Sequence, residues 1–253
     1  RGAGGGRVRR PGDGLADAPK NDLEPWLKQQ WVIPPKASAA FVAAMEDAID
    51  VSHRPRDPER PVVCVDEGGK QLAGDVREPL PVRPGSPAKG DSGYERHGTA
   101  NLFLAFEPLA GKRVLEVTDR RTAVDLAGFV RHLPDVACPS ARKVVLVTDN
   151  LNTHCAGSVY EAFEPAEARR LAERIEWRYT PKHGSWLNVA EIELSVLARQ
   201  CPDRRIPDLA TLRREVAAWE ARRNAAAVTA DRQFTTADAR VRLKRLYPTI
   251  QLQ

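Results

Sequence analysis

The stretch Lys143–His154, KVVLVTDNLNTH, decides the fold, because it runs a buried-looking strand directly into a carboxylate. Its apolar residues Val144–Val147 have the length and branching of a strand that is buried on both faces. The Asp and Asn residues that follow favour a turn. Asp149 is thereby predicted at the carboxyl end of a sheet strand, where α/β folds place their ligand sites. The alternative is that Asp149 only caps the next helix, and this segment alone does not choose between the two.

A second apolar run ends in the same way. Pro61–Asp66, PVVCVD, has the branched residues of a buried strand and stops at a carboxylate. A third candidate lies in Tyr179–Gln200, where a strand end and a turn with Pro and Gly lead into a helix that carries Glu191 and Glu193. The sequence therefore predicts carboxylates at the ends of two strands and on a facing helix.

Three carboxylates from two strands and a helix are able to bracket a pair of divalent cations. Such a pair, about 3.5–4 Å apart, activates an attacking oxygen and stabilises a leaving one in phosphodiester chemistry. Mg²⁺ is suitable because it takes few protein carboxylates and completes its shell with water and substrate phosphate. A structural alternative exists for Glu191, since Asn188 followed three residues later by Glu191 fits a capping-box variant. That alternative leaves Asp66 and Asp149 unexplained.

Helical periodicity separates Glu191 from Glu193, because two residues correspond to about 200° of rotation. Glu191 borders the apolar stripe that contains Leu187 and Leu194, whereas Glu193 lies further round the helix. A carboxylate beside a buried stripe needs a partner, and a metal ion supplies one. We therefore expect Glu191 to face the site and Glu193 to lie towards solvent.

The composition is that of a soluble globular protein. The 253 residues are 42% hydrophobic and 29% charged, and no apolar run reaches the roughly 18 residues of a membrane span. The four cysteines form no CxxC pair, so we expect reduced thiols in a cytoplasmic protein rather than disulfides or a metal cluster. The net charge of +5 is concentrated at the ends: residues 203–247 contain 11 Lys or Arg and 6 Asp or Glu. Such a balance permits a polyanionic partner.

The order of elements predicts an α/β domain with a mixed sheet. Expected helices lie at 21–30, 36–50, 123–133, 157–172, 188–200, 208–224 and 235–246, and expected strands at 61–66, 71–76, 99–108, 113–117, 144–148 and 175–180. Thr118 or Asp119 is expected to cap the helix that starts near 123. The segment 79–94 is rich in Pro and Gly and is predicted to be a loop.

Several pieces of the chain resemble DDE transposases of the insertion sequence 630 family, within the mariner superfamily. The matching pieces are VVCVDE (62–67), YERHGTANLFLAFEP (94–108), VTDRRTAVDLAGFV (117–130), VLVTDNLNTH (145–154), YTPKHGSWLNVAEIELSVLARQC (179–201) and RRIPDLATLRREVAAWEARRN (204–224). The resemblance implies a ribonuclease-H-like fold with a five-stranded mixed sheet, flanking helices and further helices at the C-terminus. It also implies that Asp66, Asp149 and Glu191 are the catalytic, metal-binding triad.

The resemblance has further implications for partners and domains. It implies two Mg²⁺ or Mn²⁺ ions, double-stranded DNA with terminal inverted repeats, a TA target dinucleotide and a homodimer on DNA. We expect residues 1–20 to be a disordered or truncated N-terminal remnant and 21–60 a helical linker region. Residues 61–202 would form the catalytic domain and 203–253 a basic helical extension of it.

Two features depart from the family pattern. Full-length relatives carry an N-terminal helix-turn-helix region that binds the terminal repeats, and this chain has no room for it. Gly68 and Gly69 follow the first acidic pair, where relatives usually carry larger or polar residues. The alternatives to an active transposase are a DNA-binding remnant without productive metal binding, and a related nuclease that only hydrolyses.

Other polar residues have two interpretations each. Asn150, Asn152, His154 and Asn188 are placed to orient the site carboxylates, although the same side chains could only satisfy the backbone of their turns. A second group of basic residues is predicted to contact DNA, the alternative being a solvated surface; it contains Lys182, His183, Arg213, Arg214, Arg222 and Arg223.

Overall fold

The computed structural model describes residues 36–151, 153–201 and 204–249. The helix predicted at 21–30, the expectation for residues 1–20, and Asn152 lie outside these residues. In the described part of the chain, no helix is both long and apolar enough to cross a membrane.

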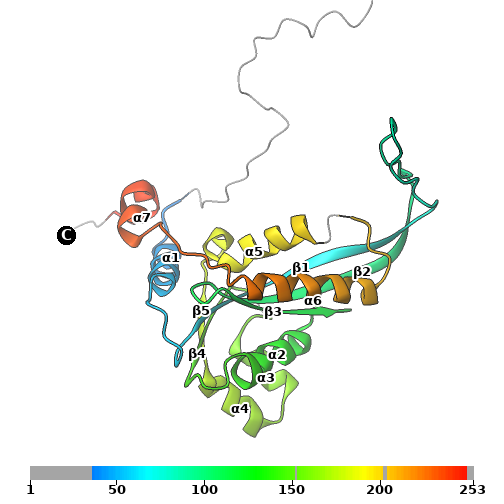
Figure 1. Ribbon diagram of the computed structural model, residues 1–253. Coiled ribbons are helices and arrows are strands. Elements are labelled where there is room, and N and C mark those ends of the chain that lie inside the picture. The colour runs from blue at the N-terminus through cyan, green and yellow to red at the C-terminus, as the bar shows by residue number, and fades with distance from the viewer. Residues whose placement is uncertain (1–35, 152, 202–203, 250–253) are drawn as a thin grey trace, which may run out of the picture. The chain divides into compact units, whose positions relative to one another are not determined.

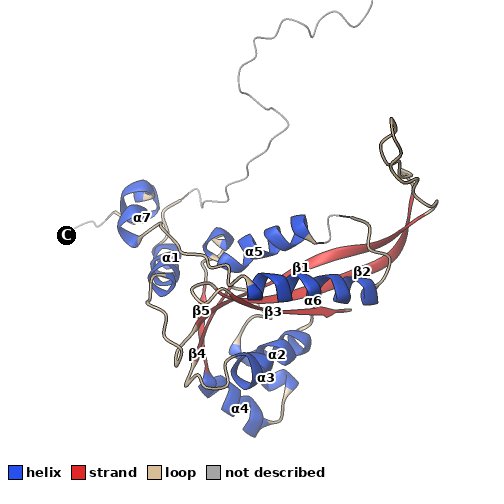
Figure 2. Cartoon of the chain, in the orientation of Figure 1, coloured by secondary structure: helices blue, strands red, loops and turns tan. Residues whose placement is uncertain are grey.

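A mixed sheet of five strands forms the centre of the fold, as predicted (Figures 1 and 2). Its order is β3-β2-β1-β4-β5, with β1 and β2 antiparallel, β2 and β3 antiparallel, and β1, β4 and β5 parallel to one another. The strands are β1 (Val62–Asp75), β2 (Tyr94–Glu107), β3 (Lys112–Thr118), β4 (Val144–Thr148) and β5 (Ile175–Tyr179).

The first strand differs from its prediction. Instead of two strands at 61–66 and 71–76, β1 is continuous over 14 residues. The reason is β2, which has the same length and pairs with β1 residue by residue through Gly68 and Gly69, up to a bulge between Leu72 and Ala73. Cross-strand pairing thus overrides the weak strand preference of glycine.

The helices mostly follow their predicted ranges, with local differences at their ends. They are α1 (Ala39–Ser52), α2 (Ala123–His132), α3 (Ala156–Ala162), α4 (Pro165–Arg174), α5 (Val189–Gln200), α6 (Leu209–Ala225) and α7 (Thr236–Arg242). The single helix predicted at 157–172 is two, because Pro165 favours the first turn of a new helix. The α2 cap is Thr122, which forms a capping box with Asp125, so the caps predicted at Thr118 or Asp119 are wrong.

Helices cover both faces of the sheet, with α2, α3 and α4 on one face and α5 and α6 on the other (Figure 1). Alternate residues of β1 supply the two cores: Val63 and Val65 pack with α2 and α3, whereas Cys64 packs with the start of α5. A burial of this kind on both faces is what the unbroken apolar runs of β1 and β4 predict. The α1 helix forms a smaller core with α7.

A buried ion pair fixes the position of α5. Arg113 of β3, with 1% of its surface exposed, donates from Nε to Glu193 Oε1 at 2.6 Å. Arg223 of α6 donates to both oxygens of the same carboxylate, from Nε at 2.7 Å and from Nη2 at 3.0 Å. Glu193 is only 4% exposed, so the expectation that it lies towards solvent is wrong. Two arginines from separate elements take Glu193 out of water, which hydrophobic periodicity alone does not reveal.

The remaining donors of Arg113 are also satisfied. Its Nη1 and Nη2 donate to the carbonyls of Gly111 at 2.7 Å and Val228 at 2.6 Å, and its guanidinium carbon lies 4.2 Å from the centroid of the Phe106 ring. Burial raises the pKa of Glu193, but the hydrogen bonds from Arg223 and Arg113 outweigh burial and leave the pKa below its ordinary value. The pair is therefore ionised, and each guanidinium nitrogen of Arg113 and each carboxylate oxygen of Glu193 has a partner, the condition under which a buried ion pair is tolerated.

Removing one partner of this network should destabilise the fold. We expect Glu193→Ala to lower the free energy of unfolding by about 3 kcal/mol or more, because Arg113 would be left buried without its counter-charge. The measurement is urea denaturation followed by circular dichroism. Glu161→Ala, at an exposed position of α3, is the matched control and should change stability by less than about 0.5 kcal/mol. Similar small changes in both variants would contradict the role assigned to the network.

Candidate functional site

Strand register brings Asp66 and Asp149 to the same place. The last parallel pair between β1 and β4 is Cys64 with Val147, and Asp66 and Asp149 each follow this pair by two residues, Asp66 within β1 and Asp149 just after the end of β4. Side chains two apart on a strand share a face. Cys64 packs against the first turn of α5, and Asp66 therefore lies towards the helix that carries Glu191.

The carboxylates lie close enough to affect one another's ionisation. The pKa of Asp66 is raised to about 7, first by burial and then by the negative charges of Glu191, Asp149 and Glu67. One hydrogen bond acts in the opposite direction, since the Glu67 N–H donates to Asp66 Oδ1 at 2.8 Å. Asp66 thus carries a proton for part of the time at neutral pH, because burial and the neighbouring negative charges both disfavour its ionised form.

His154 connects Asp149 to a fourth carboxylate. The ring is 1% exposed, its Nδ1 contacts Asp149 Oδ1 and lies 3.0 Å from Thr148 Oγ1, and its Nε2 lies 2.7 Å from Glu67 Oε2. Burial lowers the pKa of His154, but the contacts with Asp149 and Glu67 reverse this and raise it to about 9. The imidazole is therefore a cation at neutral pH, held between two carboxylates.

The sequence predicted the position of His154 beside Asp149 but not the part played by Glu67. Glu67 follows Asp66 on β1, so its side chain points to the opposite face of the strand from Asp66. There it contacts His154 Nε2. A signal was present in the chain, because a carboxylate directly after a strand-end aspartate has to find its own partner once it is buried.

Asn188 ties α5 to the sheet beside the site. It is fully buried, its Oδ1 accepts from the Ala190 N–H at 3.1 Å, and its Nδ2 donates to the Val65 carbonyl at 2.9 Å. The bond to Ala190 is an ordinary N-cap rather than a capping box with Glu191. The Glu191 side chain is thus not required for the cap, which leaves its position in the site unexplained by helix capping. Asn150 is exposed beside Asp149.

A groove of about 550 Å³ opens next to these carboxylates, between β1 and α5. Its lining contains Asp66, Glu67, Gly68, Gly69 and Lys70 from β1, and Glu191, Leu194, Ser195, Leu197 and Ala198 from α5, with Leu102 of β2. The volume lies in the range of ligand pockets, roughly 300–1,000 Å³. Two of the three predicted catalytic residues, Asp66 and Glu191, line this groove, whereas Asp149 is not part of its lining.

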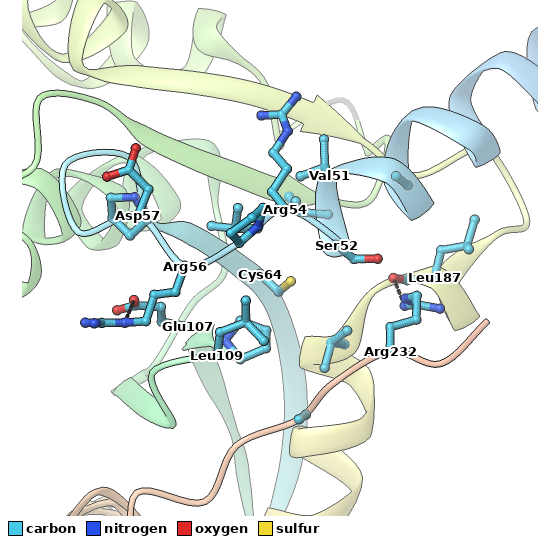
Figure 3. A pocket seen from close by; sticks show the side chains of 18 residues that line it. Val51, Ser52, Arg54, Arg56, Asp57, Cys64, Glu107, Leu109, Leu187 and Arg232 are labelled. Atoms are coloured by element: carbon cyan, nitrogen blue, oxygen red, sulfur yellow. Dashed lines mark hydrogen bonds and ion pairs between the residues drawn. The ribbon is translucent and has the colours of Figure 1, made fainter. Parts of the chain in front are cut away.

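A second cavity near Cys64 is too small to hold a substrate (Figure 3). It measures about 30 Å³ and lies between the end of α1, the start of β1 and the segment with Arg232, which donates to the Leu187 carbonyl at 2.6 Å. Such a volume admits about one water molecule. Burial raises the pKa of the Cys64 thiol to about 11, so this cysteine is an unreactive core residue.

The donor atoms fit a hard divalent cation in kind but do not form a closed ligand set. Carboxylate oxygens are what Mg²⁺ prefers, and Glu191 and Asp149 lie near enough to Asp66 for their charges to contribute to its raised pKa. Among the residues that the structure describes, no group of three or more His, Cys, Asp or Glu side chains is arranged to hold a metal ion. The arrangement is a cluster of carboxylates that repel one another, beside the groove between β1 and α5.

The basic residues predicted to contact DNA have different environments. Lys182 and His183 are exposed in the turn after β5, where His183 has a φ of 64°. Arg214 and Arg222 are exposed on α6. Two others are engaged by the protein: Arg213 donates to the Val117 carbonyl at 3.3 Å, and Arg223 is bound to Glu193.

The environment of Arg223 corrects its predicted role. Its side chain is 18% exposed and turns inward to the Glu193 carboxylate, so it does not present a charge to DNA in this structure. The helical wheel placed it off the apolar stripe, but a buried acid on α5 gives an arginine at that angle a partner inside the protein.

Residues 61–213 match the family of DDE superfamily endonucleases. The fold is also similar to solved structures of Mos1. One is the mariner Mos1 paired end complex with Mg, at 15% identity and a TM-score of 0.52, covering 88% of this chain and 68% of that chain. Another is the Mos1 mariner paired end complex with Mn, at 15% identity and a TM-score of 0.51, covering 80% of this chain and 62% of that chain. A third is the Mos1 transposase paired-end complex with left transposon end, with the same values.

At this level of identity the Mos1 structures establish the fold, and they confirm the predicted ribonuclease-H-like architecture. The chain spans 62% of the Mos1 chain in two of these complexes. No curated protein is similar enough to this chain to count as a match. Assignment to the insertion sequence 630 family stays a prediction. Because the family match covers more than half of the sequence, the chain belongs to the DDE superfamily endonuclease family.

Proposed function

We propose that this chain is the catalytic part of a DNA transposase, which cuts transposon ends and joins them to target DNA. Asp66, Asp149 and Glu191 would be the catalytic carboxylates. The observation that supports the proposal is that Glu191 and Asp149 lie near enough to Asp66 for their charges to raise its pKa, in a member of an endonuclease family.

The same three residues would hold two Mg²⁺ or Mn²⁺ ions. When bound, such ions activate the attacking oxygen and stabilise the leaving oxygen of the phosphodiester. The protein prepares the ligands: His154 holds one oxygen of Asp149 and leaves the other for the site, and Asn188 fixes the first turn of α5 against β1. Asp66 has to lose its proton before it can serve as a ligand, and a nearby cation favours that loss.

Double-stranded DNA is the proposed partner, with two chains of this protein acting as a dimer on two transposon ends. The support is that the similar Mos1 structures are paired-end complexes, together with a net charge of +5. Lys182, His183, Arg214 and Arg222 are the exposed basic residues that we propose for backbone contacts.

Two alternative functions are separated by one assay. A nuclease that only hydrolyses would nick labelled transposon-end DNA in Mn²⁺ without joining it to a second duplex. A DNA-binding remnant would slow the migration of the DNA in a gel-shift assay, both with EDTA and with Mn²⁺, without cutting it. Joined products that appear only with the divalent ion support the transposase, and their absence under cleaving conditions would contradict strand transfer.

Divalent ions should stabilise the folded protein through the aspartates. Mn²⁺ is expected to raise the melting temperature of the wild type more than that of Asp149→Asn, because the ion relieves repulsion between Asp66 and Asp149. The effect should be larger at pH 8 than at pH 5.5, since Asp66, with a pKa of about 7, is mostly protonated at the lower pH. Scanning fluorimetry measures both comparisons. Equal shifts in the two proteins at pH 8 would exclude a shared metal site.

Loss of the Glu191 carboxylate should abolish chemistry without unfolding the protein. We expect Glu191→Gln to reduce Mn²⁺-dependent cleavage of end DNA by about 100-fold or more, since even orienting groups around a metal typically contribute 10–100-fold. Its melting temperature without metal should not fall, because the cap of α5 is made by Asn188.

Glu161→Gln is the control for this substitution, at an exposed position outside the site. It should cleave at the wild-type rate. If an active preparation of Glu191→Gln also retains wild-type cleavage, the triad assignment is wrong.

A further inference from the structure

The groove beside the carboxylates continues into a second open cavity along β1. The first has a volume of about 550 Å³ and runs from Asp66 to Lys70. The second, of about 470 Å³, shares Lys70 and is lined by Gln71, Ala73, Ser92, Tyr94, Arg204 and Arg205. We name the two together the β1 groove. It begins where β4 ends, since β4 accompanies β1 only over Val62–Cys64, and α5 forms its other wall.

Two glycines keep the middle of the β1 groove open, although the fold does not require glycine there. Neither Gly68 nor Gly69 has a positive φ, so their backbone conformation is available to any residue. A Cβ at Gly69 would meet nothing within 4 Å, and a Cβ at Gly68 would make an ordinary contact of 3.8 Å with Leu194. Glycine inside a strand lowers stability relative to alanine. The fold gains nothing from this loss of stability at Gly68 and Gly69. The two glycines therefore point to a requirement for empty space in the β1 groove.

Charge changes sign along the β1 groove. Asp66, Glu67 and Glu191 lie at one end, and Lys70 and Arg204 at the other. Acidic residues near the basic end balance part of its charge, since Arg204 lies 2.8 Å from Glu215 and Arg205 lies 2.5 Å from Asp75.

The basic end also carries an aromatic ring. Tyr94 is 43% exposed, and the guanidinium carbons of Arg96 and Arg205 lie 5.8 Å and 5.6 Å from its centroid. A cationic surface with an exposed ring is the combination that binds a nucleic-acid strand, through phosphates and through stacking.

The length of the β1 groove also suits a strand of DNA. Four residues separate Asp66 from Lys70, which corresponds to about 13 Å along a strand. Nucleotides of a duplex strand advance by about 3.4 Å each along the helix axis. The groove is therefore long enough for a strand whose phosphate lies at the carboxylates to place another phosphate near Lys70.

We propose that the β1 groove binds one DNA strand next to the phosphate that reacts, with the sugars passing over Gly68 and Gly69 and a later phosphate at Lys70. This inference rests on the proposed function for the identity of the reacting phosphate. The glycine pair determines whether the strand fits, and Lys70 and Arg204 determine its attraction. Side chains larger than glycine at 68 and 69 would narrow the path without disturbing the fold.

The test places leucine in the groove. In an Asp149→Asn background, which prevents cleavage, Gly68→Leu should weaken binding of a fluorescein-labelled DNA duplex in Mn²⁺ by about tenfold, a change of 1.4 kcal/mol. Gly68 is chosen because it lies on the same face of β1 as Asp66 and Lys70, towards α5. Fluorescence anisotropy measures the dissociation constant. Gly128→Leu is the matched control, since Gly128 is exposed on α2 and a Cβ there meets nothing within 4 Å. Equal affinities in the two variants would overturn the proposal.

A second substitution tests the basic end independently of packing at the glycines. Lys70→Gln should reduce the slope of log affinity against log salt by about one, as expected for the loss of one phosphate contact. Arg142→Gln, at an exposed position that does not line the β1 groove, should be less affected. An unchanged slope for Lys70→Gln would count against a phosphate at that end.

Cleavage assays distinguish failure of this inference from failure of the proposed function. If the protein with Asp149 intact cleaves end DNA and Gly68→Leu cleaves and binds as well as Gly128→Leu, the groove inference fails alone. If no DNA is cleaved by the intact protein, the proposed function fails, and the anisotropy comparison still decides whether the β1 groove binds DNA.

Discussion

The ion pair between Arg113 and Glu193 is the constraint on which the candidate site depends. It joins β3 to α5 inside the protein, and Arg223 adds α6 to the same carboxylate. Because a helix is a rigid body, fixing Glu193 on one side of α5 fixes the direction of Glu191 two residues earlier. The position of Glu191 relative to Asp66 thus follows from an interaction on the far side of the helix. Asn188 supplies the second fixed point, at the beginning of α5.

A second buried charge interaction, between His154 and two carboxylates, acts at shorter range around Asp149. A buried imidazolium between Asp149 and Glu67 neutralises part of the negative charge that register imposes on the strand ends. Asp66 has no such partner and responds by holding its proton more tightly. The two aspartates, although equivalent in the sheet, are therefore prepared in different ways: Asp149 by a fixed counter-charge, and Asp66 by the absence of one among the described residues.

The sequence predicted the sheet and most helices because the apolar runs are long and branched. Strand and helix order followed from Val144–Val147 and similar segments, whose burial is a local property. The carboxylates that follow the apolar runs were also readable, since polar residues that interrupt a buried run are conspicuous, although Asp66 lies within β1 rather than at its end. The continuity of β1 through Gly68 and Gly69 was not readable from the sequence. It depends on pairing with β2, and cross-strand pairing is not encoded within β1 itself. Glu193, Arg223 and Glu67 were misplaced or missed for the same reason: each has a partner far away in the chain.

The order in which the chain is synthesised gives the Glu193 network a further meaning. A ribosome releases Arg113 first, then Glu193, and Arg223 only 30 residues later. Until Arg223 emerges, the Glu193 carboxylate has only one of its two counter-charges. The contacts that fix α5 on the sheet are then incomplete. The helix that carries Glu191 therefore reaches its final orientation only after α6 has left the ribosome. Assembly of the carboxylate cluster is in this way delayed until nearly the whole domain has been made.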